Sequence, residues 1–134
     1  MSKGNTFETD LLGLIFNNTD IADIGDASGL QNSATAGSLY VALHTADPGE
    51  AGTAATSEAT YTNYARVAVA RSGAGWTVSG ATATNAAQIT FPQCGASGNT
   101  ITHVSITTAI SGTSKILYSG ALNSSLAVAL NITP

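Results

Sequence analysis

Short segments in which apolar residues recur at every second position constrain this chain more than any other feature. Leu39, Val41 and Leu43 form the first such series, and a second one runs from Tyr61 to Arg71. A two-residue period places alternate side chains on opposite faces of a β-strand, so that one face is buried. We therefore expect two strands in this stretch of the chain.

The connection between these two strands is long, polar and acidic. It runs from Thr45 to Tyr61, includes Asp47, Glu50 and Glu58, and opens with an Asp-Pro-Gly turn signal. Proline presets the turn backbone, while Asp and Gly supply side-chain bonding and open conformations. A loop of roughly fifteen residues is longer than ordinary connections, and such loops are usually functional or disordered. We expect this loop to act as a contact arm.

Turn signals divide the rest of the chain into similar short segments. Apolar alternation recurs over five of them: Trp76–Val78, Ala87–Phe91, Thr100–Ala109, Lys115–Leu122 and Leu126–Ile132. About seven to eight short antiparallel strands with regularly spaced turns are typical of a β-sandwich or jelly roll. The pattern predicts an all-β protein whose β-sandwich or jelly-roll-like domain covers residues 38–134.

The N-terminal segment, residues 1–37, combines a helical pattern with a connector. Four apolar residues share one helix face at helical spacing: Phe7, Leu11, Leu14 and Ile15. Asn5 with Glu8 three residues later matches a capping box, so we expect an α-helix that begins near Asn5 or Thr6. The sequence leaves open whether its apolar face covers one end of the sandwich or docks on a neighbouring subunit. The Gly- and Ser-rich run 25–37 is the connector.

Charge is scarce and unevenly placed. Charged residues make up 9% of the chain, against about 25% in an average soluble domain. All eight acidic residues lie in residues 1–58, whereas residues 59–134 carry Arg66, Arg71 and Lys115 and no acid. The net charge of -4 argues against a nucleic-acid partner, which needs clustered basic residues. A nearly neutral surface suits a protein that neighbours cover in an assembly.

The apolar run at residues 11–16 is too short for a secretory signal or a membrane span, which takes about twenty apolar residues. We therefore expect no membrane partner and assembly in a cytoplasm.

Residue types that carry chemistry are present without a recognisable site pattern. His44 and His103 are the two histidines, and neither belongs to the ligand spacings of a zinc site. The three aspartates within residues 20–26 lack the pattern of a calcium loop, and no Gly-x-Ser-x-Gly elbow occurs. Cys94 is the one cysteine, which excludes an internal disulfide. We expect no catalytic residue, metal or cofactor.

Aromatic and arginine side chains, which are enriched at protein interfaces, cluster from Tyr61 to Trp76. The sequence leaves open whether Tyr64 and Trp76 fill the core instead, and Arg66 is expected to hold a loop carboxylate such as Glu58. The candidate partner interface comprises Phe7, Leu11, Leu14, Ile15, Asp47, Glu50, Glu58, Tyr61, Tyr64, Arg66 and Arg71.

The same segments carry a family resemblance. SLYVALHTADPGEAG, EATYTNYARVAVAR, GWTVSG, NAAQITFP, ITHVSI and LYSGAL, together with the helical LLGLIF, resemble small structural proteins of tailed phages and prophages. Members are often named tail fibre proteins and are similar to β-sandwich cement proteins that decorate capsids. The resemblance covers nearly the whole chain and implies a virion structural protein.

We expect a capsid cement or decoration protein, because fibres usually show length, repeats and a trimeric stalk pattern, and this chain shows none. The resemblance then implies the major capsid protein and further copies of the chain, as a dimer or trimer, as partners at the capsid surface. The alternative is a tail fibre or receptor-binding tip. In that role Tyr61 and Trp76 would be the platform for a host glycan.

Overall fold

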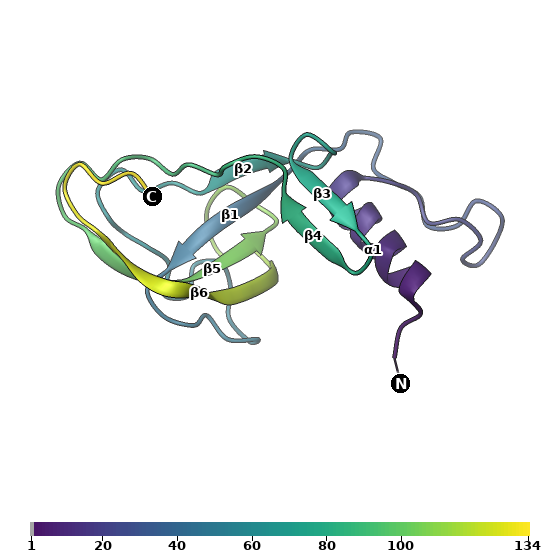
Figure 1. The fold of residues 1–134 in the computed structure, drawn as a ribbon, viewed down its shortest axis with the longest axis horizontal. Helices are drawn as coiled ribbons and strands as arrows, with labels where there is room; N and C mark the ends of the chain where they lie inside the picture. Colours follow the sequence, from purple (N-terminus) through teal and green to yellow (C-terminus); the bar gives the residue numbers. More distant parts are fainter. Residues whose placement is uncertain (1) are drawn as a thin grey trace. The chain divides into compact units, whose positions relative to one another are not determined.

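The chain forms one helix followed by six strands, as shown by a computed structural model that describes residues 2–134 (Figure 1). This confirms an all-β protein with an N-terminal α-helix, although six strands replace the predicted seven to eight. The elements are α1 (Asn5–Asn17), β1 (Ser38–His44), β2 (Val67–Ala70), β3 (Trp76–Ser79), β4 (Thr82–Asn85), β5 (Asn99–Thr107) and β6 (Ile116–Val128).

These elements belong to two compact units. The helix–hairpin unit comprises residues 1–38 and 69–88, and the sheet unit comprises residues 39–68 and 89–134. One sheet has the strand order β2-β1-β5-β6, and β3 and β4 form a separate two-stranded sheet. Edge strand β2 carries the chain out of the sheet unit, so that each unit is built from two separate stretches of sequence.

In the helix–hairpin unit, α1 packs on the hairpin of β3 and β4. The contact centres on Phe16 and Trp76, which are both buried and meet edge to face with ring centroids 4.8 Å apart. Successive helix residues are rotated by about 100°. Phe16 therefore lies on the side of α1 away from Phe7, Leu11 and Leu14.

The C-terminal end of α1 is capped by a side chain, whereas the capping box predicted at its N-terminal end is wrong. The N-cap residue is Gly4, which makes no side-chain cap hydrogen bond, and the Glu8 N–H donates to the Gly4 carbonyl. At the other end the Arg71 guanidinium donates to the carbonyls of Leu14 and Ile15 at 2.6 and 2.7 Å. A cation there satisfies orphan carbonyls and complements the helix dipole.

Strand β1 is the centre of the sheet unit. Leu39, Val41 and Leu43 are each 5% exposed, as the sequence alternation predicts. Their neighbours Ala42 and His44 are fully buried as well, so most of β1 is covered on both faces. The strand lies between β2 and β5, and it pairs antiparallel with β5 (Figure 1).

Four predicted strands take another form. The predicted strands Lys115–Leu122 and Leu126–Ile132 merge, up to residue 128, into the 13-residue β6, which pairs with β5 despite a register shift between Ile101 and His103. Ala87–Phe91 is not a strand; its last residue, Phe91, donates its N–H to the Pro134 carbonyl. The segment Tyr61–Arg71 becomes a strand only at Val67–Ala70.

Within residues 2–134, α1 is the only helix, and it has 13 residues. No helix in this part of the chain is long and apolar enough to cross a membrane.

Candidate functional site

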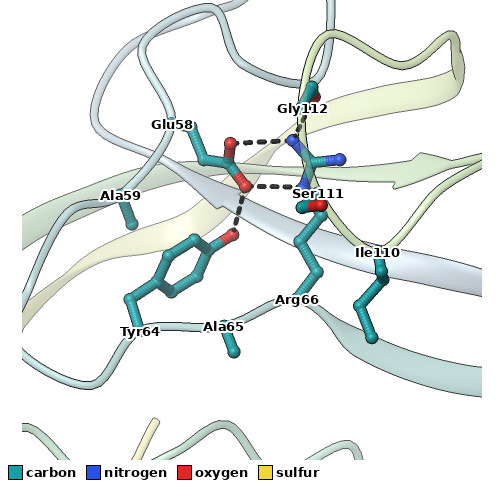
Figure 2. A pocket seen from close by; sticks show the side chains of 8 residues that line it. All are labelled: Glu58, Ala59, Tyr64, Ala65, Arg66, Ile110, Ser111 and Gly112. Carbon is teal, nitrogen blue, oxygen red and sulfur yellow. Dashed lines mark hydrogen bonds and ion pairs between the residues drawn. The ribbon is translucent and has the colours of Figure 1, made fainter.

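Two loops of the sheet unit enclose a pocket that contains a buried ion pair (Figure 2). One loop runs from Glu58 to Arg66, just before β2, and the other joins β5 to β6. The cavity has a volume of about 270 Å³. Its lining residues are Glu58, Ala59, Tyr64, Ala65, Arg66, Ile110, Ser111 and Gly112.

Arg66 is the central residue of this pocket, and its side chain is only 1% exposed. Its Nε donates to Glu58 Oε1 at 2.6 Å and its Nη2 to Glu58 Oε2 at 2.8 Å, which is a bidentate pair. The remaining donors reach Ala109 O at 2.9 Å, Ser114 Oγ at 3.0 Å and Gly112 O at 2.8 Å. A guanidinium has five N–H donors, so every one of them is used within the chain.

Tyr64 completes the cluster from the side of the loop. Its hydroxyl donates to Glu58 Oε1 and accepts the backbone N–H of Leu43, both at 3.0 Å. Glu58 thus receives three hydrogen bonds, and the Tyr64 ring ties the loop to β1. Figure 2 shows the Tyr64 hydroxyl and the Arg66 guanidinium converging on the Glu58 carboxylate.

Electrostatics hold both partners of Glu58 in their protonated forms. The hydrogen bond with Glu58 raises the pKa of Arg66, and burial raises the pKa of the Tyr64 phenol. Neither group can exchange a proton near neutral pH. Removing one member of a buried pair leaves an uncompensated charge. The cluster is therefore suited to fastening two loops together.

A second polar pair lies inside the sheet unit. His44 Nδ1 is 2.9 Å from the Thr56 carbonyl oxygen, and His44 Nε2 is 2.7 Å from Ser105 Oγ. A carbonyl oxygen can only accept, so Nδ1 carries the proton and Nε2 accepts from the Ser105 hydroxyl. Burial lowers the pKa of His44, which keeps the imidazole neutral.

The contact between Ser105 and His44 has the distance of a nucleophile and its base. Both residues are buried, however, at 1% and 0% exposure, so a substrate has no access to them. Sequence reasoning missed this pair, because 61 residues separate its members and neither lies in a motif.

Other residues that could carry chemistry do not converge. In the part of the chain that the structure describes, His, Cys, Asp and Glu side chains form no group of three that could hold a metal ion. Cys94 is fully buried, and its Sγ lies 3.4 Å from the Ser97 carbonyl oxygen.

The structure brings Glu58, Tyr64 and Arg66 together and scatters the rest of the predicted interface set. Tyr61 and Arg66 are buried, at 2% and 4% exposure, so their assignment to a surface interface is corrected. The Tyr61 hydroxyl donates to the Pro92 carbonyl instead. Trp76 is buried as well, so Tyr61 and Trp76 cannot form a glycan platform.

The remaining predicted interface residues have varied environments. Phe7 is 39% exposed, and Leu11, Leu14 and Ile15 are partly buried along α1. Arg71 caps that helix. Asp47 and Glu50 are exposed, and Asp47 Oδ1 accepts the Gly49 N–H within the turn. The long loop itself folds back on the sheet unit, because the Thr45 N–H donates to Ser57 O and the Ala54 N–H to Ser114 O.

A second and more open pocket, of about 310 Å³, lies where residues 49–52 approach the start of β6. Glu50, Lys115 and Tyr118 are among its lining residues. It places the exposed Tyr118 ring, which the sequence analysis did not single out, beside two exposed charges.

Exposed apolar side chains gather near one end of the sequence. Of the eight large apolar residues that are exposed in residues 2–134, four form what we call the apolar strip: Tyr118, Leu126, Leu130 and Ile132. They lie on β6 and on the segment that follows it. The signal that could have indicated them is the absence of any charged residue after Lys115.

A family model described as "Podophage GP4 fiber I protein gp80" matches residues 4–131 of the chain. The match includes α1 and all six strands, and thus both compact units. No curated protein matches the chain.

Proposed function

Since the chain belongs to the podophage GP4 fiber I protein family, we propose that it is a structural subunit of a tail fibre that works by packing against neighbouring virion proteins. The family membership confirms the expected relation to phage structural proteins. The observation that carries the finer proposal is the extent of the match, because residues 4–131 include α1 and all six strands.

The buried polar groups support a role without catalysis. All N–H donors of the Arg66 guanidinium bond to groups of the same chain, and the Glu58 carboxylate accepts hydrogen bonds from Arg66 and Tyr64. His44 and Ser105 are out of reach of a substrate. These clusters act as internal fasteners that let a sparsely charged chain keep its long loop in place.

The surface supports a role in assembly. The apolar strip and Phe7 are exposed in the single chain, and burying apolar area is worth about 25 cal/mol per Å². A standard protein interface covers about 1,600 Å², and only the surplus over association costs appears as affinity. Repetition of such contacts along a fibre makes modest pairwise affinities sufficient.

A capsid cement or decoration protein, bound to the major capsid protein at the capsid surface, is the second candidate. The observation in its favour is the absence of repeats or stalk patterning in the 134-residue sequence, whose two units are both compact. A cement protein would use the same exposed apolar residues across joints between capsid subunits.

Copy number in purified virions tests both candidates. Quantitative mass spectrometry would give the ratio of this chain to the major capsid protein, and gold-labelled antibodies would locate it by electron microscopy. A tail fibre subunit is expected on the order of tens of copies at the tail, whereas a cement protein occupies the symmetry-related positions of the whole shell, on the order of hundreds. Absence from purified particles would refute both proposals.

A further inference from the structure

The outer edge of β6 is an unpaired strand edge. In the sheet order β2-β1-β5-β6, β6 has β5 on one side and, within residues 2–134, no strand on the other (Figure 1). Such an edge presents N–H and C=O groups that a further strand can match, and proteins commonly protect edges with charged residues or proline. The sequence of β6, ILYSGALNSSLAV, contains neither.

The faces of β6 are poorly covered as well. Nine of its 13 residues are exposed, whereas the central strand β1 buries five of its seven. Of the apolar strip, Tyr118 and Leu126 are 42% and 37% exposed, and Leu130 and Ile132 are 57% and 42% exposed. Tyr118 pairs with Ile106 and Leu126 with Ile101, and these β5 residues are five positions apart, so Tyr118 and Leu126 project from opposite faces of the sheet. Exposed apolar side chains on both faces beside an unpaired edge allow main-chain pairing together with apolar burial, which is the chemistry of β-strand addition.

The shape of β6 decides where a further strand can add. Because the register shifts between Ile101 and His103, residues 122–125 lie opposite a single residue of β5, and strands bend at such irregularities. The regular part of the ladder runs from Tyr118 to Ala121. An added strand therefore meets a regular backbone edge there.

We infer that this edge pairs antiparallel with β6 of a second copy of the chain, around a twofold axis at Gly120. Twofold, self-complementary interfaces are the commonest in homo-oligomers. Like charges opposite one another destabilise paired strands, and β6 has none. The charges nearest to this ladder are Lys115 and Glu50, which line the pocket beside Tyr118 and are opposite in sign.

The register follows from the axis. Gly120 faces Gly120 of the second copy, and Ser119 faces Ala121 of the second copy, so that these pairs lie within the regular part of the ladder. A Cβ added at Gly120 would meet no atom within 4 Å in the single chain, so the face of the sheet at Gly120 has room for a substituted side chain. The product is one continuous sheet with two sets of the strands β2-β1-β5-β6.

This inference rests on the proposed function for one premise, that identical subunits meet in the assembled virion. The test is sedimentation equilibrium of the purified full chain over a hundredfold range of concentration. The wild type should dimerise, and Gly120→Glu should weaken the dimer at least about tenfold, because two carboxylates then face each other. Ala81→Glu, the same charge change on an exposed turn between β3 and β4, should leave the dissociation constant unchanged.

Two complementary experiments identify the contact itself. Mixing Gly120→Glu with Gly120→Lys should restore dimers that neither variant forms well alone. Gly120→Cys should give a covalent dimer on mild oxidation, whereas Ala81→Cys and the wild type, whose Cys94 is fully buried, should not. Circular dichroism of each variant checks that the sheet is intact.

A wild-type chain that stays monomeric over the whole range overturns the pairing, and so does a dimer that Gly120→Glu leaves as tight as before. Either result is distinguishable from failure of the proposed function, which shows as absence of the chain from purified virions.

Discussion

Replacing Arg66 by Met should destabilise the sheet unit by about 3 kcal/mol. The change removes all five hydrogen bonds of the guanidinium and leaves Glu58, a 19% exposed carboxylate, with only the Tyr64 hydroxyl as donor. Breaking a buried ion pair from one side costs about 3–5 kcal/mol. Because water can still reach part of Glu58, the lower end of that range applies.

The partner variants separate the ion pair from the other contacts. Arg66→Lys keeps the positive charge but replaces the five donors of the planar guanidinium with the three donors of an ammonium group. The decrease in the free energy of unfolding should therefore lie between zero and that of Arg66→Met. In the double variant Glu58→Gln with Arg66→Met no buried charge is left unpaired. Its loss should be smaller than the sum of the two single losses by about 1–2 kcal/mol. Lys115→Met, at an exposed position, should change stability by less than about 0.5 kcal/mol.

Urea denaturation followed by two probes measures these losses. Far-UV circular dichroism reports on the sheets, and the fluorescence of Trp76 reports on the helix–hairpin unit. If the two units unfold together, the probes give the same midpoint for each variant. A loss below about 1 kcal/mol for Arg66→Met would refute the view that this cluster fastens the loops.

Three further predictions concern other internal contacts. Burial lowers the pKa of His44 below its ordinary value of 6.5, so below pH 6.5 the unfolded chain binds a proton at this residue more readily than the folded chain does. The free energy of unfolding is therefore highest above pH 6.5 and decreases as the pH falls, by at most about 1.4 kcal/mol per pH unit. Urea titrations at several pH values should show this slope in the wild type and a shallower one in His44→Gln; equal slopes would contradict it. Arg71→Met should lower the stability of the helix–hairpin unit by about 2 kcal/mol, because the carbonyls of Leu14 and Ile15 lose charged donors; an unchanged Trp76 transition would count against this cap. Gly29→Ala should cost well over the roughly 1 kcal/mol of Gly25→Ala, since both have positive φ but only the Cβ at residue 29 would lie 1.8 Å from the Ile21 carbonyl oxygen; equal melting temperatures for the two variants would show that this clash is relieved.

Local patterns predicted the elements whose stability is local. The alternation of Leu39, Val41 and Leu43 identified β1, and the helical spacing of apolar residues identified α1. The N-cap was misplaced because Gly4 occupies that position without a side-chain cap hydrogen bond, so no side-chain pattern marks it. The predicted pairing of Arg66 with Glu58 appears in the structure because eight residues separate them, a distance that a single loop can close.

Contacts that depend on distant parts of the chain could not be predicted. Tyr64 and Arg66 alternate with apolar residues like members of a strand, yet their side chains turn to Glu58 and to the loop around Gly112. Tertiary hydrogen bonds thus override strand propensity there. Likewise, nothing in the run around Asn123 indicates that two predicted strands join across a register shift, because only the pairing with β5 decides it.

A high-resolution electron microscopy map of the assembled virion tests the central claim most directly. The chain should occupy density in the tail fibre, with the apolar strip and the β6 edge covered by a neighbouring copy. A map in which the chain is absent from the particle, or in which the strip from Tyr118 to Ile132 faces solvent at every copy, would contradict it.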